Sequence, residues 1–323
     1  MHKRETAARE KTTVTMGFWG TAQDLKTYQE MAAAISEKYP DITLKIKQYP
    51  SSEQFWNTLP GEIAAGVAPD FIKLTNEGAF EYINKGLFAP LDELLGPAGV
   101  DMSRFTPSAV NIWKKKTVNN TRFRISICLL CSLLTKKCGK KAGLGDYPKT
   151  WDEVEAAAKK LKTKDVAGIT INIDAYHITN YAKSYGGGWG NGKTISTPEN
   201  VQALQKIFDM YKEGVAVTPK ALGYGWDGEV FANGKSAMTT GGYWYKGYLK
   251  DAAPNLKYVV LPVPKGTVNA STMISDGYVV LKDAKKQASG ASGSELYDQR
   301  QGRNRIYEAW FQSGGDKPFF QIL

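Results

Sequence analysis

The sequence has few of the side chains from which metal and redox sites are built. Its 323 residues include only two histidines and three cysteines, too few for most catalytic metal centres. Cys128, Cys131 and Cys138 have no fourth ligand at a suitable spacing. We therefore interpret them as chance composition rather than as a zinc or redox site. The sequence predicts no metal site and no cofactor.

Long apolar runs and the common catalytic motifs are also absent. No stretch of about 18 apolar residues is present, which predicts that no helix spans a membrane. Residues 1–20 have no apolar core of signal-peptide type, so we expect any export signal to be absent from this version of the chain. There is no P-loop, G-x-S-x-G or H-E-x-x-H pattern, and Gly186-Gly187-Gly188 stands without a dinucleotide fingerprint around it.

Acidic side chains are missing from one segment, and this absence explains the net charge of +10. Between Lys114 and Lys141 there are nine basic residues, no acidic residue and all three cysteines, and the rest of the chain has a net charge of only +1. Because the charge is confined to one segment of foreign composition, it is no argument for a nucleic-acid partner, and we expect none. With 42% hydrophobic residues, the chain has ample material for a core.

The N-terminal part of the chain alternates between strand and helix patterns. Thr13–Phe18 is typical of a buried strand, and Thr21 is placed to cap a helix that ends at Tyr39. Residues 42–46 alternate strictly and predict a second strand. Strand, helix and strand in this order predict a parallel βαβ unit. A helix at 55–65 and a strand at 71–74 are expected to continue it.

A second α/β region begins near Ala142. Thr150 and Glu153 have the spacing of a capping box, which predicts a helix start. Thr197-Pro198 opens another helix, whose apolar face is expected to hold Val201, Leu204, Ile207 and Tyr211. Further strands are expected at 168–173, 237–240, 258–263 and 277–281, of which the last two are candidates for a return to the first domain.

Aromatic residues beside glycine or beside one another form four corners, in loops or at the ends of expected strands: Trp19-Gly20, Gly188-Trp189-Gly190, Tyr224-Gly225-Trp226 and Tyr243-Trp244-Tyr245. Open α/β sheets bind ligands at the carboxyl ends of their strands. A flat indole stacks well on the apolar face of a sugar ring. Packing in the core or between domains explains any single corner equally well. The four corners together favour a carbohydrate site.

Eight runs of sequence, which cover most of residues 13–286, follow the order of a known family. They are TVTMGFWG, EKYPDITLK, AAGVAPDFIKL, NKGLFAPLDELL, AGLGDYPKTWDEVEAAAKKL, GGWGNGKTISTPENVQAL, WDGEVFANGKSAMTTGGYWY and SDGYVVLKDAK. In these runs the chain resembles extracytoplasmic solute-binding proteins of bacterial ABC transporters, in the sugar-binding group that includes maltose-binding protein. The resemblance implies an α/β protein with the two-lobed periplasmic-binding-protein fold of type II. Its lobes would be joined by crossing strands and close on the ligand like a hinge.

The resemblance also implies where the ligand lies. The ligand-binding residues would come from both lobes: Trp19, Thr75 and Asn76 from the first, and Tyr176, Trp189, Trp226, Tyr243 and Trp244 from the second. Asp70 is expected to shape its turn rather than to contact sugar. No catalytic residue is implied.

The implied function is that of the carbohydrate-binding subunit of an ABC importer. As the resemblance has it, the protein is a monomer outside the cytoplasm, a cell-surface lipoprotein or a periplasmic protein, that delivers its sugar to the permease subunits and is not an enzyme. A solute-binding protein for a non-sugar ligand is an alternative. A glycoside-active enzyme is another, since Asp227 and Glu229 form a close acidic pair beside an aromatic corner. Both are expected at a helix start, where acids commonly favour the dipole.

One internal segment departs from the family pattern. Where the family carries a G-K-x-Y-G-x-P-Y segment, this chain has KTVNNTRFRISICLLCSLLTKKCGKK. Codons for these residues, taken one base out of register, permit D-G-K-Q-Y, A-V-P-Y and N-K-E-M-W. We hypothesise an out-of-frame translation that is entered near Lys116 and left near Lys140. Phe123, Ile125 and Ile127 still alternate, so that a strand can form there.

The family pattern is lost again after Lys286. We expect residues 287–323 to be an anomalous or truncated C-terminal part of the second lobe. The other expected boundaries are a flexible tail at 1–12, a first lobe at 13–116 plus about 257–286, and a second lobe from about 117 to 256, of which 117–140 is anomalous.

Overall fold

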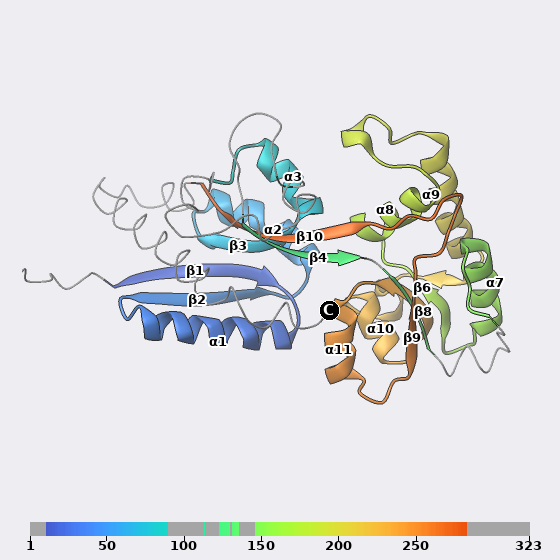
Figure 1. Cartoon of the computed structure of the whole chain (residues 1–323), viewed down its shortest axis with the longest axis horizontal. Helices are drawn as coiled ribbons and strands as arrows, with labels where there is room; N and C mark the ends of the chain where they lie inside the picture. The colour runs from blue at the N-terminus through green and yellow to red at the C-terminus, as the bar shows by residue number, and fades with distance from the viewer. Residues whose placement is uncertain (1–10, 90–112, 114–122, 130, 136–145, 283–323) are drawn as a thin grey trace, which may run out of the picture. The chain divides into compact units, whose positions relative to one another are not determined.

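The computed structural model describes residues 11–89, 113, 123–129, 131–135 and 146–282 (Figure 1). The chain divides into two compact units. Unit 1 comprises residues 1–126 and 275–323, and unit 2 comprises residues 127–274. The divisions fall within two strands, β4 (Phe123–Leu129) and β10 (Met273–Val280). Each unit is built around its own five-stranded sheet with helices, so the fold is α/β as predicted.

Unit 1 is built on a sheet of strand order β2-β1-β3-β10-β4. Strand β1 pairs in parallel with β2 and with β3, whereas β10 runs antiparallel to β3. The predicted parallel βαβ unit is therefore confirmed. The remaining elements are β1 (Thr12–Trp19), α1 (Ala22–Lys38), β2 (Ile42–Tyr49), α2 (Ser52–Ala64), β3 (Phe71–Thr75) and α3 (Asn76–Asn84).

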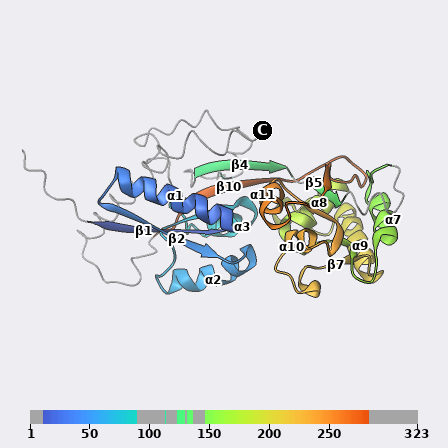
Figure 2. The same ribbon diagram turned by 90° about the horizontal axis from the view of Figure 1, so that it is seen from below.

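Helices α1 and α2 lie on opposite faces of the unit 1 sheet (Figure 2). On one face, Met16 and Phe18 of β1 pack with Ile35 of α1. On the other face, Ile72 of β3 packs with Phe55 of α2. The strands are apolar on both sides because a helix covers each side, which is the pattern expected of a parallel sheet.

Unit 2 is built on a sheet of strand order β7-β6-β8-β5-β9. Strand β6 is parallel to β7 and to β8, and β5 is antiparallel to β8 and to β9. Its strands are β5 (Cys131–Thr135), β6 (Ala167–Thr170), β7 (Ala216–Val217), β8 (Ser236–Gly241) and β9 (Tyr258–Leu261). Its helices are α7 (Trp151–Leu161), α8 (Ala175–Ser184), α9 (Pro198–Lys212), α10 (Asp227–Ala232) and α11 (Trp244–Ala252).

Local sequence signals set several of the helix boundaries. Thr21 and Asp24 form a capping box at the start of α1, and Thr150 and Glu153 form one at the start of α7. In each box the threonine hydroxyl accepts from a backbone N–H while the acid accepts from the N-cap N–H. Both predicted helix starts are confirmed.

Two expectations differ from the structure. We expected the chain to return to the first lobe at about residue 257, but β9 pairs with β5 in the unit 2 sheet and unit 1 resumes only at Ser275. We also expected Val201 and Leu204 on the buried face of α9, but their side chains are 54% and 38% exposed. The buried stripe instead includes Asn200, because this side chain binds the loop that precedes the helix.

The segment of foreign composition supplies strands to both sheets. Strand β4 takes part in the sheet of unit 1, and β5 lies between β8 and β9 in unit 2, so the predicted strand at residues 123–127 is confirmed. Leu133 and Leu134 of β5 are each only 1% exposed and belong to the core. Thr135 is also buried, and within the part of the chain that the structure describes its hydroxyl has no hydrogen-bond partner. The frame hypothesis for this segment stays a prediction.

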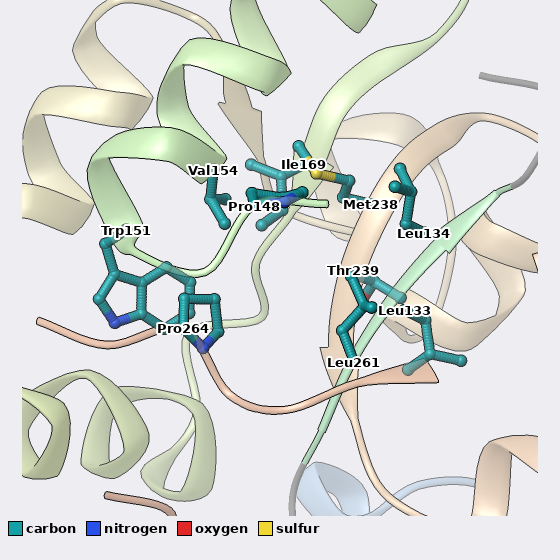
Figure 3. Close-up of a pocket in the computed structure, with 10 residues that line it drawn as sticks. All are labelled: Leu133, Leu134, Pro148, Trp151, Val154, Ile169, Met238, Thr239, Leu261 and Pro264. Atoms are coloured by element: carbon teal, nitrogen blue, oxygen red, sulfur yellow. The ribbon is translucent and has the colours of Figure 1, made fainter. Parts of the chain in front are cut away.

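A small cavity lies beside β5 in unit 2 (Figure 3). It has room for about one water molecule at most. The cavity is far too small for a sugar. Its lining is almost entirely apolar and consists of Leu133, Leu134, Pro148, Trp151, Val154, Ile169, Met238, Thr239, Leu261 and Pro264. The cavity is a packing gap beside the unusual strand.

None of the helices in the described ranges combines the length and the apolar character that crossing a bilayer requires.

Candidate functional site

The three candidate residues of unit 1 lie at one edge of its sheet. Trp19 is the last residue of β1, Thr75 is the last residue of β3, and Asn76 begins α3. Because β1 and β3 are parallel neighbours, their carboxyl ends meet at the same edge. The structure thus brings Trp19, Thr75 and Asn76 to one edge of the sheet.

The indole of Trp19 is partly buried against helix α2. Its ring centroid lies 4.7 Å from that of Phe55 and 5.8 Å from that of Trp56. Packing against α2 therefore accounts for part of the Trp19 ring. The side chain remains partly accessible, so packing and ligand contact are compatible here.

A cation lies beside Trp19 that the sequence did not single out. The ammonium of Lys73 is 5.8 Å from the centroid of the indole and 3.0 Å from the carboxylate of Asp276. Burial alone lowers the pKa of Lys73, but the carboxylate of Asp276 outweighs it, and the pKa is raised. The lysine is therefore charged, and its charge is neutralised by Asp276. No local signal links two residues so distant in sequence.

Asp70 has the structural role expected of it. The residue is 1% exposed, and its carboxylate accepts a hydrogen bond of 2.8 Å from the backbone N–H of Thr15. The side chain thereby ties the start of β3 to β1.

In unit 2, Tyr176 and Trp244 form an aromatic pair. Tyr176 is the second residue of α8, which follows β6, and Trp244 is the first residue of α11, which follows β8. Since β6 and β8 are parallel neighbours, the segments that follow them start from the same edge of the sheet. The two rings are perpendicular, with centroids 5.7 Å apart.

Trp226 and Tyr243 directly precede helices α10 and α11. Trp226 occupies the N-cap position of α10 and packs against Tyr245, with centroids 5.3 Å apart, and against Tyr248, at 4.7 Å. Tyr243 precedes α11 and is 50% exposed. Gly228 is required for the position of Trp226, because a Cβ at this glycine would lie 2.1 Å from the indole.

Trp189 is held against the same helix that carries Tyr176. Its indole N–H donates to the hydroxyl of Thr179 at 2.8 Å, and Thr179 lies one turn beyond Tyr176 on α8. Asn200 fixes the surrounding loop: its amide oxygen accepts from Gly188 N–H at 2.9 Å, and its amide nitrogen donates to the carbonyls of Gly188 and Thr194. The loop therefore presents Trp189 in a defined place.

A buried polar network lies beneath Tyr176. The imidazole of His177 is fully buried, with Nδ1 2.9 Å from Asp174 Oδ1 and Nε2 3.4 Å from Asp227 Oδ2. Asp227 Oδ2 also accepts from the hydroxyls of Tyr245 and Thr239. Burial alone lowers the pKa of His177, but the carboxylates of Asp174 and Asp227 raise it to about 10.

The acidic pair that suggested an enzyme does not face a common point. Asp227 is 0% exposed and binds His177 and Tyr245, whereas Glu229 accepts from the backbone N–H of Gly225 at 2.8 Å. A glycosidase needs two carboxyl groups on either side of one bond, so this pair does not supply the required arrangement. Within the described ranges, no cluster of three or more histidine, cysteine or acidic side chains is arranged to hold a metal ion.

Comparison with known proteins settles the family. A family model described as "Bacterial extracellular solute-binding protein" matches residues 19–291. The chain belongs to this family. This solute-binding protein is 24% identical over 247 residues to the maltotriose-binding protein of Pyrococcus abyssi. The aligned region covers 75% of this chain and 51% of that protein. The chain is 28% identical over 235 residues to the sn-glycerol-3-phosphate-binding periplasmic protein UgpB of Rhizobium meliloti, which covers 63% of this chain and 55% of that one.

Solved structures give the same fold. An ABC substrate-binding protein of Listeria monocytogenes in complex with cycloalternan has a TM-score of 0.75 and 25% identity, and covers 93% of this chain and 79% of the other. Maltose-bound MalE3 of T. maritima has a TM-score of 0.72 and 20% identity, with 92% and 76% covered. The predicted periplasmic-binding-protein fold is confirmed. The chain spans about half to two thirds of the length of the curated relatives it matches (51% and 65% for the first two).

Proposed function

We propose that this solute-binding protein captures a carbohydrate for an ABC importer. The observation that carries the proposal is the perpendicular pair of Tyr176 and Trp244, whose helices follow neighbouring parallel strands. The same two helices also hold the other indoles, because Thr179 of α8 binds Trp189 and Tyr245 of α11 packs against Trp226. Several flat apolar faces with polar groups between them suit the alternating C–H and hydroxyl surface of a sugar. The names of relatives that bind maltotriose, cycloalternan and maltose support the same ligand class.

The candidate ligand-binding residues are those predicted from the sequence. In this proposal Trp19, Thr75 and Asn76 contribute from unit 1, and Tyr176, Trp189, Trp226, Tyr243 and Trp244 contribute from unit 2. The protein would work outside the cytoplasm as a monomer, without a cofactor, and deliver the sugar to permease subunits. It would carry out no reaction of its own, because Asp227 and Glu229 are both engaged in local contacts.

A phosphorylated ligand is the main alternative, since relatives named for sn-glycerol-3-phosphate also match the chain. Lys73 is the cation that lies over the indole of Trp19, and its ammonium is already paired with Asp276. Binding a phosphate at this place would require the anion to compete with an internal carboxylate. The paired lysine therefore favours a neutral ligand.

The test is calorimetric titration of the purified chain with a panel of mono- and oligosaccharides and with glycerol 3-phosphate. We expect one class of sugar to bind and Trp244→Ala to weaken it at least about tenfold, as expected for a central aromatic contact. Phe208→Ala is the matched control, because Phe208 is an aromatic residue 60% exposed on α9, outside the proposed site. Binding of glycerol 3-phosphate but of no sugar would overturn the proposal, and so would equal sugar affinity in Trp244→Ala.

A further inference from the structure

The contacts of His177 define its charge. One ring nitrogen, Nδ1, lies 2.9 Å from a carboxylate oxygen of Asp174, and the other, Nε2, lies 3.1 Å from the carbonyl oxygen of Thr240. Both partners are acceptors, so each ring nitrogen must carry a proton to make its hydrogen bond. The geometry therefore requires an imidazolium, although the side chain is fully buried.

This imidazolium lies at the centre of a continuous series of contacts. On one side, the ring of Tyr176 lies over the ring of His177, with centroids 3.9 Å apart and planes tilted by 36°, and Tyr176 in turn meets Trp244. On the other side, the carboxylate of Asp227 accepts a hydrogen bond from the hydroxyl of Tyr245, and the ring of Tyr245 packs against Trp226. The series joins aromatic residues that come from α8, α10 and α11.

We propose that His177 is a positioning residue for the carbohydrate site, whose imidazolium fixes Tyr176 and Trp244 on one side and Trp226, through Asp227 and Tyr245, on the other. The inference rests on the proposed function and deepens it. Sugar affinity would depend on His177 although the side chain itself touches no ligand. Loss of its proton would leave two neighbouring carboxylates facing a neutral ring, and the aromatic side chains on both sides would lose their common support.

Other titratable groups surround the imidazole of His177. Asp174 comes from the start of α8, Asp227 from α10 and Tyr245 from α11. The pKa of Tyr211 of α9 is raised, mainly by burial and further by the carboxylates of Asp174 and Asp227. The carboxylates stabilise the imidazolium, and the pKa of His177 of about 10 agrees with the charge that the contacts require. The proton is then retained throughout the neutral range.

The decisive variant is Asp174→Asn. Asparagine keeps an oxygen that can accept from His177 and can still cap α8, but it removes one of the two charges that hold the proton. We expect the pKa of His177 to fall and sugar affinity to become pH-dependent, with weaker binding at higher pH. The wild-type protein should keep a constant affinity from about pH 6 to about pH 8.5, and His177→Gln should bind at least about tenfold more weakly at every pH.

Two readouts keep structural effects separate from positioning. The sequence has only two histidines, so His2→Gln leaves His177 as the single histidine, and its Cε1 proton reports its charge by NMR without ligand. Val154→Ala, in the core of unit 2 and outside the network, is the control for lost stability, and its affinity should stay at the wild-type value. Titration of His177 with an ordinary midpoint near about 6.5 would overturn the inference.

The outcomes also separate this inference from the proposed function. If the wild-type protein binds no sugar, the proposed function is overturned and the inference falls with it. If the wild-type protein binds a sugar, and Asp174→Asn and His177→Gln bind it equally well at every pH, only the positioning role is overturned. A pH-dependent affinity in Asp174→Asn that follows the NMR titration of His177 would support both.

Discussion

Replacing Thr135 by valine tests whether the unusual strand β5 fits the core of unit 2. Thr135 is 4% exposed, and its hydroxyl has no hydrogen-bond partner among the residues that the structure describes. A buried polar group without a partner costs about 1–3 kcal/mol. Valine has nearly the same shape and no hydroxyl, so Thr135→Val should raise the free energy of unfolding by about 1 kcal/mol or more.

The assay is a thermal melt of the whole chain. For a unit of this size, a gain of about 1 kcal/mol corresponds to about 2–4 °C in the melting temperature. Thr239→Val is the matched control in the adjacent strand β8, because the hydroxyl of Thr239 donates to Asp227 at 3.0 Å. This control should lose about 1.5–3 kcal/mol, the usual contribution of a hydrogen bond to a charged acceptor. An unchanged or lower melting temperature in Thr135→Val would refute the reasoning.

Three further predictions concern the loop, the core and the pH dependence of unit 2. Asn200→Ala removes the hydrogen bonds that hold Gly188 and Thr194, and limited proteolysis should then cut between residues 188 and 195 while wild-type protein resists. Ser184→Ala leaves the buried indole N–H of Trp151 without its 2.8 Å partner and should lower stability by about 1–3 kcal/mol in a melt, whereas an unchanged melt contradicts this. The pKa of His177 is about 10 in the folded chain and about 6.5 in the unfolded chain. The contribution of its charge to stability is therefore complete below about pH 6.5 and is lost as the pH rises toward 10, so the melting temperature should fall over this window. A fall of the same size in His177→Gln would show that other groups cause it.

Local patterns were sufficient for much of the fold. The alternation in residues 42–46 predicts part of the strand β2, and the spacing of Thr21 and Thr150 from the acids that follow them predicts helix starts that the structure contains. The resemblance implied Trp19 and Thr75 as ligand residues, and the structure places them at the carboxyl ends of two neighbouring parallel strands.

Long-range contacts account for what the sequence did not predict. Helix α9 carries two apolar stripes, and periodicity cannot choose between them; the buried one is selected by Asn200, whose partners lie in a loop. The pairing of His177 with Asp227 joins residues 50 positions apart, and that of Lys73 with Asp276 spans more than half the chain. Such pairs have no signature in a single sequence.

The frame hypothesis has its own test at the level of DNA. Sequencing the gene and close homologues should reveal a compensating pair of single-base changes around the codons for residues 117–140. Their absence would leave the nine basic residues between positions 114 and 141 unexplained.

The order of strands in unit 1 has a consequence for the protein during its synthesis. Strand β10 lies between β3 and β4 in the sheet although it is the last of the described strands to be made. On the ribosome, the N-terminal sheet therefore stays divided until residue 280 has emerged, whereas the five described strands of the unit 2 sheet lie between residues 131 and 261. Vectorial synthesis thus allows the second unit to finish folding before the first, and β1, β2 and β3 must wait with an open edge. A ribosome that pauses between residues 135 and 280 prolongs this exposure, and the nascent chain is then most in need of a chaperone.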